Sequence, residues 1–281
     1  LVQIPQRLQQ RRPQRGQAAR LRMGAAPGQQ ARLRVWKVEQ LVRQLGRHQI
    51  LPLGHRQLDQ ATLVSDLSLE IPRSMTLGLV GESGCGKTTT GRLLLRVIEP
   101  DAGEFSFGEV SDVFALDREG LSHLRKKMQY IFQDPYGSLN PKMQVRDIVT
   151  EPLRYGGGLS SRDLDRRAGE LLERVGLSPG DSRKYPHEFS GGQRQRLSIA
   201  RAISSAPSFI VCDEPVSSLD VSIQSQILNL LLDIQRDLGI SYLFIAHNLA
   251  VVFYLSDLVS VMYAGRIVES GPSRAIYDQA L

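Results

Sequence analysis

The stretch that decides the fold reads Gly81-Glu82-Ser83-Gly84-Cys85-Gly86-Lys87-Thr88. It has the form G-x-x-x-x-G-K-[ST], which is the pattern of a phosphate-binding loop. The apolar run 75–80 before it predicts a buried strand, and the leucine-rich run 88–96 after it predicts a helix. The glycines therefore fall on a strand-to-helix turn, which is the context that the motif requires.

Such a loop predicts a site for the phosphates of a nucleotide and for Mg2+. Glycines let successive backbone N–H groups point into one concavity, and the N-terminus of the helix adds a partial positive charge. Lys87 would reach the β- and γ-phosphates, and the Thr88 hydroxyl would ligate the Mg2+ that bridges them. The alternative is a glycine-rich turn followed by an exposed lysine, which the flanking strand and helix disfavour.

Length and composition indicate a globular protein. A chain of 281 residues with an apolar fraction of 41% can build a core for one large domain or two small ones. No apolar run approaches the roughly 18 to 20 residues that span a bilayer, and no signal segment opens the chain. The two cysteines, Cys85 and Cys212, have no spacing typical of a disulfide framework or metal site, so we expect a reducing cytosol.

The positive charge is concentrated at the N-terminus. The first 60 residues hold twelve Lys or Arg against Glu39 and Asp59, a net charge of +10, which leaves −4 for the rest of a chain of net charge +6. Residues 1–32 are rich in Arg and Gln and contain no acid, so we predict a disordered tail. A basic tail can bind nucleic acid, but no aromatic residues are interleaved to stack bases, so we do not expect it here.

From residue 33 onward the pattern predicts a folded α/β domain. Alternating polarity in 63–71 indicates a half-exposed antiparallel strand, and prolines and amphipathic helices in 134–189 indicate a helical insertion. Alternating helices and strands after residue 190 predict a parallel sheet with helices on both faces. The predicted strands are 33–38, 63–71, 75–80, 105–108, 128–132, 208–213, 241–246 and 258–263. The predicted helices are 88–96, 144–154, 162–175, 193–204, 222–238 and 249–255, with a turn at 101–104 and a loop around 51–54.

A second group of acidic residues lies far downstream of the loop. The run Phe209-Ile210-Val211-Cys212-Asp213-Glu214 is an apolar strand that ends in two carboxylates. In a nucleotide-binding sheet the adjacent strand brings Asp213 to the Mg2+ and leaves Glu214 beside the γ-phosphate. Glu214 would then polarise the attacking water. Without the phosphate loop, a solvated carboxylate at a strand end would be the default interpretation.

The run Phe189-Ser190-Gly191-Gly192-Gln193-Arg194-Gln195-Arg196 stands between these groups, just before a predicted helix. With it the sequence resembles the ABC-transporter ATPase family, in whose L-S-G-G-Q signature Phe189 replaces the leucine. Further matches follow in the family's order: Gln133 at the Q-loop, Ser217-Ser218-Leu219-Asp220 at the D-loop and His247 at the switch position. Alone, Gln133 could be a surface amide and His247 a strand-end histidine, but their joint order supports the family.

The resemblance covers about residues 33–278, and it is closest to the ATP-binding subunits of bacterial oligopeptide, dipeptide and nickel importers. Three stretches carry this narrower match: 132–141, 185–190 and 213–222. The resemblance implies an ABC-type P-loop NTPase fold with a mixed sheet, a small antiparallel β subdomain and a helical subdomain at about 134–189. The expected division is a tail at 1–32 and an ATPase domain at 33–281.

The resemblance also implies a mechanism. Two such domains pair head to tail and trap each ATP between one phosphate loop and the other signature, so that Ser190 and Gly192 act in trans. His247 would hydrogen-bond the γ-phosphate, and Gln133 would link the Mg2+ site to the helical insertion, which contacts the membrane subunits in this family. The expected catalytic residues are Lys87, Glu214 and His247, and the expected metal ligands are Thr88, Gln133 and Asp213. The expected nucleotide-binding residues are Gly81, Ser83, Gly84, Cys85, Gly86, Lys87, Thr88, Thr89, Gln133, Ser190, Gly191, Gly192, Gln193 and Asp220.

The expected function is that of a peripheral ATPase subunit on the cytoplasmic face of the membrane, which powers import of peptides or a related small solute. Its expected partners are a second ATPase subunit, in a homo- or heterodimer, transmembrane permease subunits and, indirectly, an extracytoplasmic solute-binding protein. One alternative is a soluble ABC-type ATPase acting on nucleic acid or ribosomes, which a single nucleotide domain disfavours. A non-catalytic partner in a heterodimer is another, and the intact Lys87, Glu214 and His247 disfavour it.

The sequence departs from the family pattern in three places. Where the family has an aromatic residue that stacks on adenine, this chain has Leu45 or His48, with Trp36 as a possible substitute. Asn248 stands where the subfamily commonly has Asp, an exchange that we expect to be tolerated. A chain that starts at Leu1 and ends before the usual C-terminal extension is also compatible with a truncated or degenerate gene product.

Overall fold

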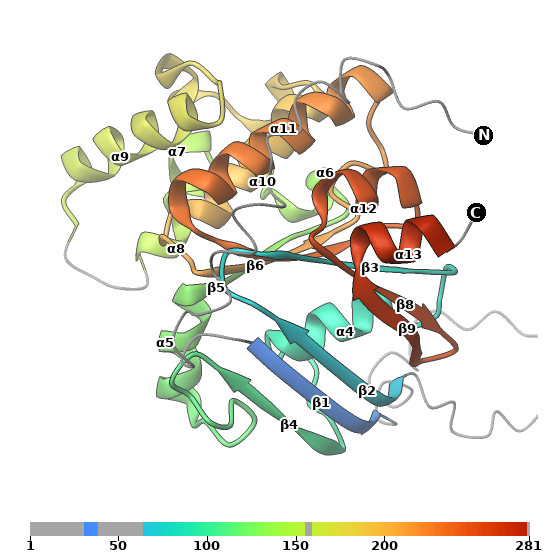
Figure 1. Cartoon of the computed structure of the whole chain (residues 1–281). Coiled ribbons are helices and arrows are strands. Elements are labelled where there is room, and N and C mark those ends of the chain that lie inside the picture. The colour runs from blue at the N-terminus through green and yellow to red at the C-terminus, as the bar shows by residue number, and fades with distance from the viewer. Residues whose placement is uncertain (1–30, 39–63, 155–158, 280–281) are drawn as a thin grey trace, which may run out of the picture.

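A computed structural model describes residues 31–38, 64–154 and 159–279 (Figure 1). Its centre is a six-stranded sheet in the order β5-β6-β7-β3-β8-β9. All neighbours in it run parallel except β8 and β9, which are antiparallel. Its strands are β3 Thr76–Gly81, β5 Met128–Ile131, β6 Phe209–Asp213, β7 Ser241–Ile245, β8 Leu258–Tyr263 and β9 Arg266–Pro272. The predicted mixed α/β fold is confirmed.

The central strands are apolar because both of their faces are covered. Every residue of β6 and of β7 is buried, as expected for parallel strands between two helical layers. Along β6, Phe209 and Val211 join the core beneath helix α4 (Lys87–Leu94), whereas Ile210 and Cys212 join the core beneath the helices of the other face. Figure 1 shows α4 on one side of the sheet and α10, α11 and α12 on the other.

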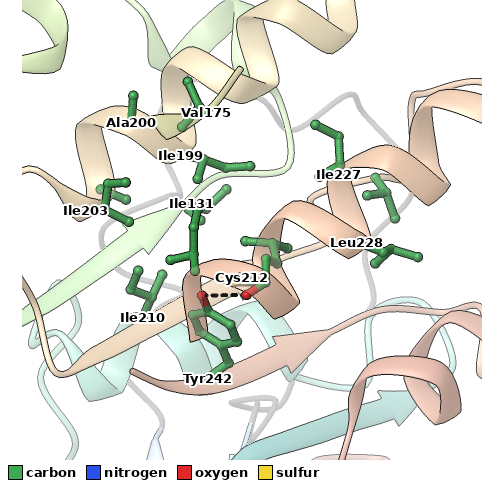
Figure 2. Close-up of a cluster of buried hydrophobic side chains, with 14 of the residues drawn as sticks. Ile131, Val175, Ile199, Ala200, Ile203, Ile210, Cys212, Ile227, Leu228 and Tyr242 are labelled. Atoms are coloured by element: carbon green, nitrogen blue, oxygen red, sulfur yellow. Dashed lines mark hydrogen bonds between the residues drawn. The ribbon is translucent and has the colours of Figure 1, made fainter. Parts of the chain in front are cut away.

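The second core is the larger one, and Figure 2 shows part of it. Ile131 and Tyr242 from the sheet meet Ile199 of α10 and Ile227 of α11 there. The helices on this face are α10 Gly191–Ile203, α11 Val221–Leu238 and α12 Leu249–Leu255. Each lies within two residues of the predicted bounds, because its apolar residues recur with helical period.

A second, antiparallel sheet lies below α4 in Figure 1, in the order β2-β1-β4. Its strands are β1 Ala31–Val38, β2 Val64–Ile71 and β4 Ala102–Phe107. The alternating burial of β2 confirms the predicted half-exposed strand. The predicted turn at 101–104 is wrong, because Gly103 and Glu104 pair with β1, and β1 itself begins two residues before the expected boundary of the tail.

Between β5 and α10, the regular elements of residues 135–154 and 159–188 are all helices or 3-10 turns. They are α6 Pro135–Ser138, α7 Val145–Val149, α8 Glu151–Arg154, α9 Ser161–Arg174 and the 3-10 turns η1 Pro179–Arg183 and η2 Pro186–Glu188. Helices α7 and α9 lie at the upper left of Figure 1. The single helix predicted over 144–154 is wrong: it breaks at Thr150. Pro152 explains the break, because proline has no N–H for the hydrogen bond that a continuous helix would need there.

Within the helical region α6, η1 and η2 were not predicted as separate elements, and outside it three elements escaped prediction: α5 Arg118–Lys127, β9 Arg266–Pro272 and α13 Ser273–Gln279. Only Leu124 is buried in α5, which begins where the Asp117 side chain accepts a hydrogen bond from the backbone N–H of Gly120 at 2.8 Å. β9 is an edge strand with no buried residue. β9 therefore has no alternating burial from which a strand could be predicted, and the apolar face of α5 consists of Leu121 and Leu124 alone. Within residues 31–38, 64–154 and 159–279, none of the helices has the length and apolar character of a bilayer-crossing helix.

The sheet lies so close to α12 that Gly78 in β3 leaves no room for a side chain. A Cβ there would come within 2.3 Å of Val252 Cγ1 and 2.5 Å of Ser256 Oγ. We therefore expect Gly78→Ala to lower the free energy of unfolding by about 1–3 kcal/mol, measured by urea denaturation. Gly169→Ala in α9 is the matched control, because a Cβ there would lie 3.5 Å from Pro179 Cβ, an ordinary van der Waals distance. Equal stabilities for both variants would contradict this packing.

Candidate ATP-binding and hydrolysis site

The phosphate loop, residues 81–88, joins β3 to α4 at the carboxyl edge of the sheet. A Cβ at Gly81 would lie 2.1 Å from the carbonyl oxygen of Met262 in β8, so only glycine fits between these strands. Gly86 precedes α4 with φ 111°, a left-handed conformation that favours glycine. The loop thus takes the strand-to-helix turn that its sequence predicts.

Lys87 folds back along this loop. Its ammonium group donates hydrogen bonds to the carbonyl oxygens of Gly81 at 2.8 Å and Glu82 at 2.7 Å, and the side chain is buried. Cys85 is buried too, and its backbone N–H donates to the Glu82 carbonyl at 3.3 Å. Ser83 and Gly84 are exposed on the loop, and Thr89 is half-buried in α4. The Lys87 ammonium group therefore lies where it and the backbone N–H groups of the loop can bind the same phosphate oxygens.

Thr88 and Asp213 meet across the edge of the sheet. The Thr88 hydroxyl donates to Asp213 Oδ1 at 3.1 Å, although the two residues are 125 positions apart. Asp213 is buried, and burial raises the pKa of its carboxyl group, while hydrogen bonds from Tyr130 and Thr88 act in the opposite direction. A hydroxyl and a carboxylate are oxygen ligands of the kind that Mg2+ prefers.

The described residues contain no group of three or more His, Cys, Asp or Glu that could hold a metal ion by itself. Mg2+ is usually bound through one or two protein carboxylates together with substrate phosphates and water. The pair of Thr88 and Asp213 beside a phosphate loop therefore suits Mg2+ that arrives with a nucleotide.

Glu214 follows Asp213, and its carboxylate contacts two other predicted site residues, Gln133 and His247. Gln133 Nε2 donates to Glu214 Oε2 at 3.0 Å, and His247 Nδ1 lies 3.3 Å from the same oxygen. Glu214 is half-buried, and it also lines a small surface cavity together with Ser217 and His247. Gln133 thus reaches Glu214, but among the hydrogen bonds of the described residues none joins it to Thr88 or Asp213.

The backbone of Glu214 is held in an unusual conformation. Its φ is 46°, in the left-handed region that costs a non-glycine residue roughly 1 kcal/mol or more. Its N–H donates to the carbonyl of Ile245 at 2.9 Å, and its carbonyl accepts from the Ser217 N–H at 3.2 Å and hydroxyl at 3.1 Å. These bonds fix the backbone after β6, and the carboxylate meets Gln133 and His247 there.

The signature residues lie on α10. Ser190 is exposed and caps the helix: its hydroxyl accepts from the Gln193 N–H at 3.4 Å, and its own N–H donates to Gln193 Oε1 at 3.0 Å. A Cβ at Gly192 would lie 2.6 Å from Ile223 Cγ2, so this glycine lets α10 approach α11. In the part of the chain that the structure describes, no hydrogen bond joins Ser190 or Gln193 to the phosphate loop.

The structure describes some of the remaining predicted residues, and others lie outside the described part of the chain. Asp220 is exposed and precedes α11, and Gly191 is half-buried with Leu219 as its neighbour. The Asn248 carbonyl Oδ1 accepts from the Ala250 N–H at 3.0 Å and so caps α12, a task that Asn performs as well as Asp. Leu45 and His48 lie outside the described residues, as do the tail 1–30 and the loop around 51–54, and nothing is described of the Trp36 side chain.

The sequence did not single out Tyr130, whose hydroxyl donates to Asp213 Oδ2 at 2.7 Å. Tyr130 occurs in an apolar strand, and from the sequence its side chain would be interpreted as an ordinary core residue. The signal that finds it is the neighbourhood of β5 and β6, which no pattern along the chain reveals.

Comparisons with known proteins agree with this geometry. A model of the family described as ABC transporter matches residues 64–217. The oligopeptide transport ATP-binding protein OppF of Bacillus subtilis strain 168 is 47% identical over 241 residues, which cover 85% of this chain and 77% of that protein. The glutathione import ATP-binding protein GsiA of Escherichia coli strain K12 is 53% identical over 227 residues, 80% of this chain but only 36% of that protein.

Solved structures show the same fold at low sequence identity. The ATP-binding cassette MJ0796, in a dimeric post-hydrolysis state bound to ADP and Pi, superposes with a TM-score of 0.72 at 23% identity, over 87% of this chain and 99% of that chain. The protein cbiO1 of Clostridium perfringens, part of the ABC transporter complex cbiONQ, superposes with a TM-score of 0.74 at 23% identity, over 90% and 92%.

Proposed function

Because this chain belongs to the ABC transporter family and is an ATP-binding ATPase subunit, we propose that it powers the import of peptides or a related small solute. The relatives OppF and GsiA, named for oligopeptide transport and glutathione import, support this substrate class. The subunit works at the cytoplasmic face of the membrane, where the helices between β5 and α10 contact transmembrane permease subunits. An extracytoplasmic solute-binding protein delivers the solute to those subunits.

One observation carries the hydrolytic part of the proposal. The amide of Gln133 and the imidazole of His247 both lie within 3.3 Å of Oε2 of Glu214, although the three residues are distant in sequence. Glu214 directly follows Asp213, which accepts a hydrogen bond from Thr88. Such a convergence supports Glu214 as the base, because phosphoryl transfer to water needs a base close to the metal ligands and the phosphate loop, and Glu214 directly follows Asp213 in the chain.

The residues of this chain then divide the work. Thr88 and Asp213 hold Mg2+, which when bound neutralises charge on the phosphates. Lys87 exchanges its bonds to the Gly81 and Glu82 carbonyls for phosphate oxygens. Glu214 accepts the proton of the attacking water, and its αL backbone keeps the carboxylate aimed at that water.

The other two residues that meet at Glu214 sense the nucleotide. His247 hydrogen-bonds the γ-phosphate, and its 61% exposed side chain is free to turn toward it. Gln133 precedes α6 at the start of the helical region, so a shift of its amide on hydrolysis reaches the helices that contact the permease subunits.

The signature acts on the ATP of a second copy or of a related subunit. Ser190 is exposed at the N-terminus of a 13-residue helix, where a hydroxyl and free N–H groups suit a γ-phosphate. Its helix α10 lies on the opposite face of the sheet from α4, the helix that follows the phosphate loop of the same chain (Figure 1). A head-to-tail dimer brings such a signature over the loop of the partner.

This arrangement predicts that Ser190→Arg abolishes hydrolysis without weakening ATP binding by the isolated chain. The arginine blocks closure of the dimer, so turnover falls by about 10² or more, whereas the phosphate loop of the same chain is untouched. Turnover per chain of the unmodified protein should also rise with protein concentration. Both are measured by phosphate release and by equilibrium ATP binding.

Ser160→Arg is the matched control, because Ser160 caps α9 in the same way and is also exposed. Its turnover should equal that of the unmodified chain. Loss of ATP binding in Ser190→Arg would mean that the signature serves the loop of its own chain, and unchanged turnover would remove Ser190 from the reaction.

The transport part is tested in vesicles that carry the permease subunits. Peptide-loaded solute-binding protein inside the lumen should stimulate ATP turnover by the subunit added outside. Stimulation by RNA without permease subunits would instead favour the nucleic-acid alternative.

A further inference from the structure

The two oxygens of the Asp213 carboxylate have different partners. Oδ1 accepts from the Thr88 hydroxyl at 3.1 Å, and Oδ2 accepts from the Tyr130 hydroxyl at 2.7 Å. Asp213 and Tyr130 are only 4% and 9% exposed, so water competes weakly for these bonds. The shorter bond is thus made by a residue that belongs to none of the motifs of the site.

Tyr130 is placed by the order of the strands. β5 runs parallel to β6 with Tyr130 opposite Val211, so its long side chain reaches forward to the residue two positions after its partner. The Phe132 ring packs against the Tyr130 ring, with 4.6 Å between their centroids. The ring is therefore fixed from the side of β5.

The hydroxyl group passes beneath α4 through a space that a glycine leaves open. A Cβ at Gly91 would lie 3.3 Å from the Tyr130 hydroxyl oxygen and 2.9 Å from Val211 Cγ1. Any larger residue at position 91 would press on the tyrosine from above. The phenol is held on both sides, as a group that orients a neighbour must be.

The hydrogen bond has a defined direction. An ionised carboxylate can only accept, so the Tyr130 hydroxyl is the donor and its hydrogen bond runs to Oδ2. The carboxylate then cannot rotate about its Cβ–Cγ bond without losing a buried, charge-assisted bond. Oδ1 stays directed at Thr88.

We propose that Tyr130 is a positioning residue, which holds the Asp213 carboxylate so that Oδ1 faces Thr88 and the cation. This inference rests on the cation site assigned to Thr88 and Asp213 under the proposed function. Partners that orient a metal ligand from behind typically contribute 10–100-fold to metal affinity. Since Tyr130 acts on one oxygen of one ligand, the expected contribution is about tenfold, at the lower end of that range.

Tyr130→Phe tests this in the full chain, because phenylalanine keeps the ring that packs on Phe132 and lies under Gly91. The non-hydrolysable analogue AMP-PNP is titrated calorimetrically in Mg2+ and, separately, in EDTA. We expect an unchanged Kd in EDTA, where no cation needs the carboxylate, and a Kd about tenfold higher in Mg2+. A merely structural role would move both values or neither.

Tyr242→Phe is the matched control. Tyr242 is a buried tyrosine of the neighbouring strand β7, and its hydroxyl donates to the carbonyl of Leu231 at 3.1 Å on the other face of the sheet (Figure 2). It loses a buried hydrogen bond of the same kind without touching Asp213. Its ratio of the two Kd values should equal that of the unmodified chain.

Asp213→Asn separates this inference from the proposal beneath it. If Asp213→Asn removes the effect of Mg2+ on the Kd while Tyr130→Phe leaves it unchanged, the cation site stands and the role of Tyr130 is overturned. If Asp213→Asn leaves the effect of Mg2+ intact, the cation site itself is wrong and the inference fails with it. A selective loss in Tyr130→Phe, with Asp213→Asn more severe, supports both.

Discussion

Replacing Glu214 with glutamine is expected to lower ATP turnover by about 10² to 10⁴ while ATP binding persists. An amide of the same shape can still contact Gln133 and His247, which lie within 3.3 Å of Oε2 in the unmodified chain. It cannot accept a proton from water, so the loss falls on the chemical step. Phosphate release and equilibrium ATP binding are measured side by side on the same preparation.

Glu99→Gln serves as the control for this variant. Glu99 has a 57% exposed side chain paired with Arg96, so its neutralisation changes charge without touching the site, and exposed pairs of this kind contribute at most about 1 kcal/mol. Its turnover should match the unmodified chain. Near-normal turnover in Glu214→Gln would show that another group activates the water.

Replacing Lys87 with alanine is expected to reduce turnover by about 10² to 10³ and to weaken ATP binding as well. The loop carbonyls of Gly81 and Glu82 hold the ammonium group, which under the proposed function binds the phosphates of ATP. Unlike the loss in Glu214→Gln, this one affects the ground state, because charge on the phosphates exists before hydrolysis begins. The expected signature is a raised Kd for ATP together with a lowered rate.

Lys87→Arg distinguishes charge from shape. The Lys87 side chain is 5% exposed and surrounded by the loop, so a planar guanidinium should not fit where the point charge of an ammonium does. We expect it to be nearly as defective as Lys87→Ala. Lys142→Ala, at an exposed lysine of the helical region, should behave like the unmodified chain. Full activity in Lys87→Ala would contradict the assignment of the phosphate loop.

The sequence alone predicted the elements whose cause is local. The strand at 75–80, the loop at 81–88 and the helix after it follow from apolar periodicity and from backbone angles that glycine favours. The helices α10, α11 and α12 follow from apolar faces of the same kind. Prediction failed for β9, which has no buried residue, and for α5, whose apolar face is limited to Leu121 and Leu124. The turn predicted at 101–104 failed because pairing with β1 draws these residues into β4.

The candidate site divides in the same way. The sequence by itself determined which residue types stand at the carboxyl ends of strands and at helix N-termini: Lys87 and Thr88 in the loop, Asp213 and Glu214 after β6, and Ser190 before α10. The sequence also determined the order of these motifs along the chain, and this order identified the ABC-transporter family. These are properties of short segments, and short segments can be interpreted without knowing their neighbours in space.

Only the tertiary structure decided which of these residues touch. Gln133 and Glu214 are 81 positions apart, and Tyr130 and Asp213 are 83 apart. Their bonds exist because β5 lies beside β6, a sheet order that depends on how every other layer packs. The sequence therefore indicates only a core tyrosine at position 130. Its hydroxyl becomes the partner of Asp213, the candidate metal ligand, because the assembled sheet brings β5 and β6 together.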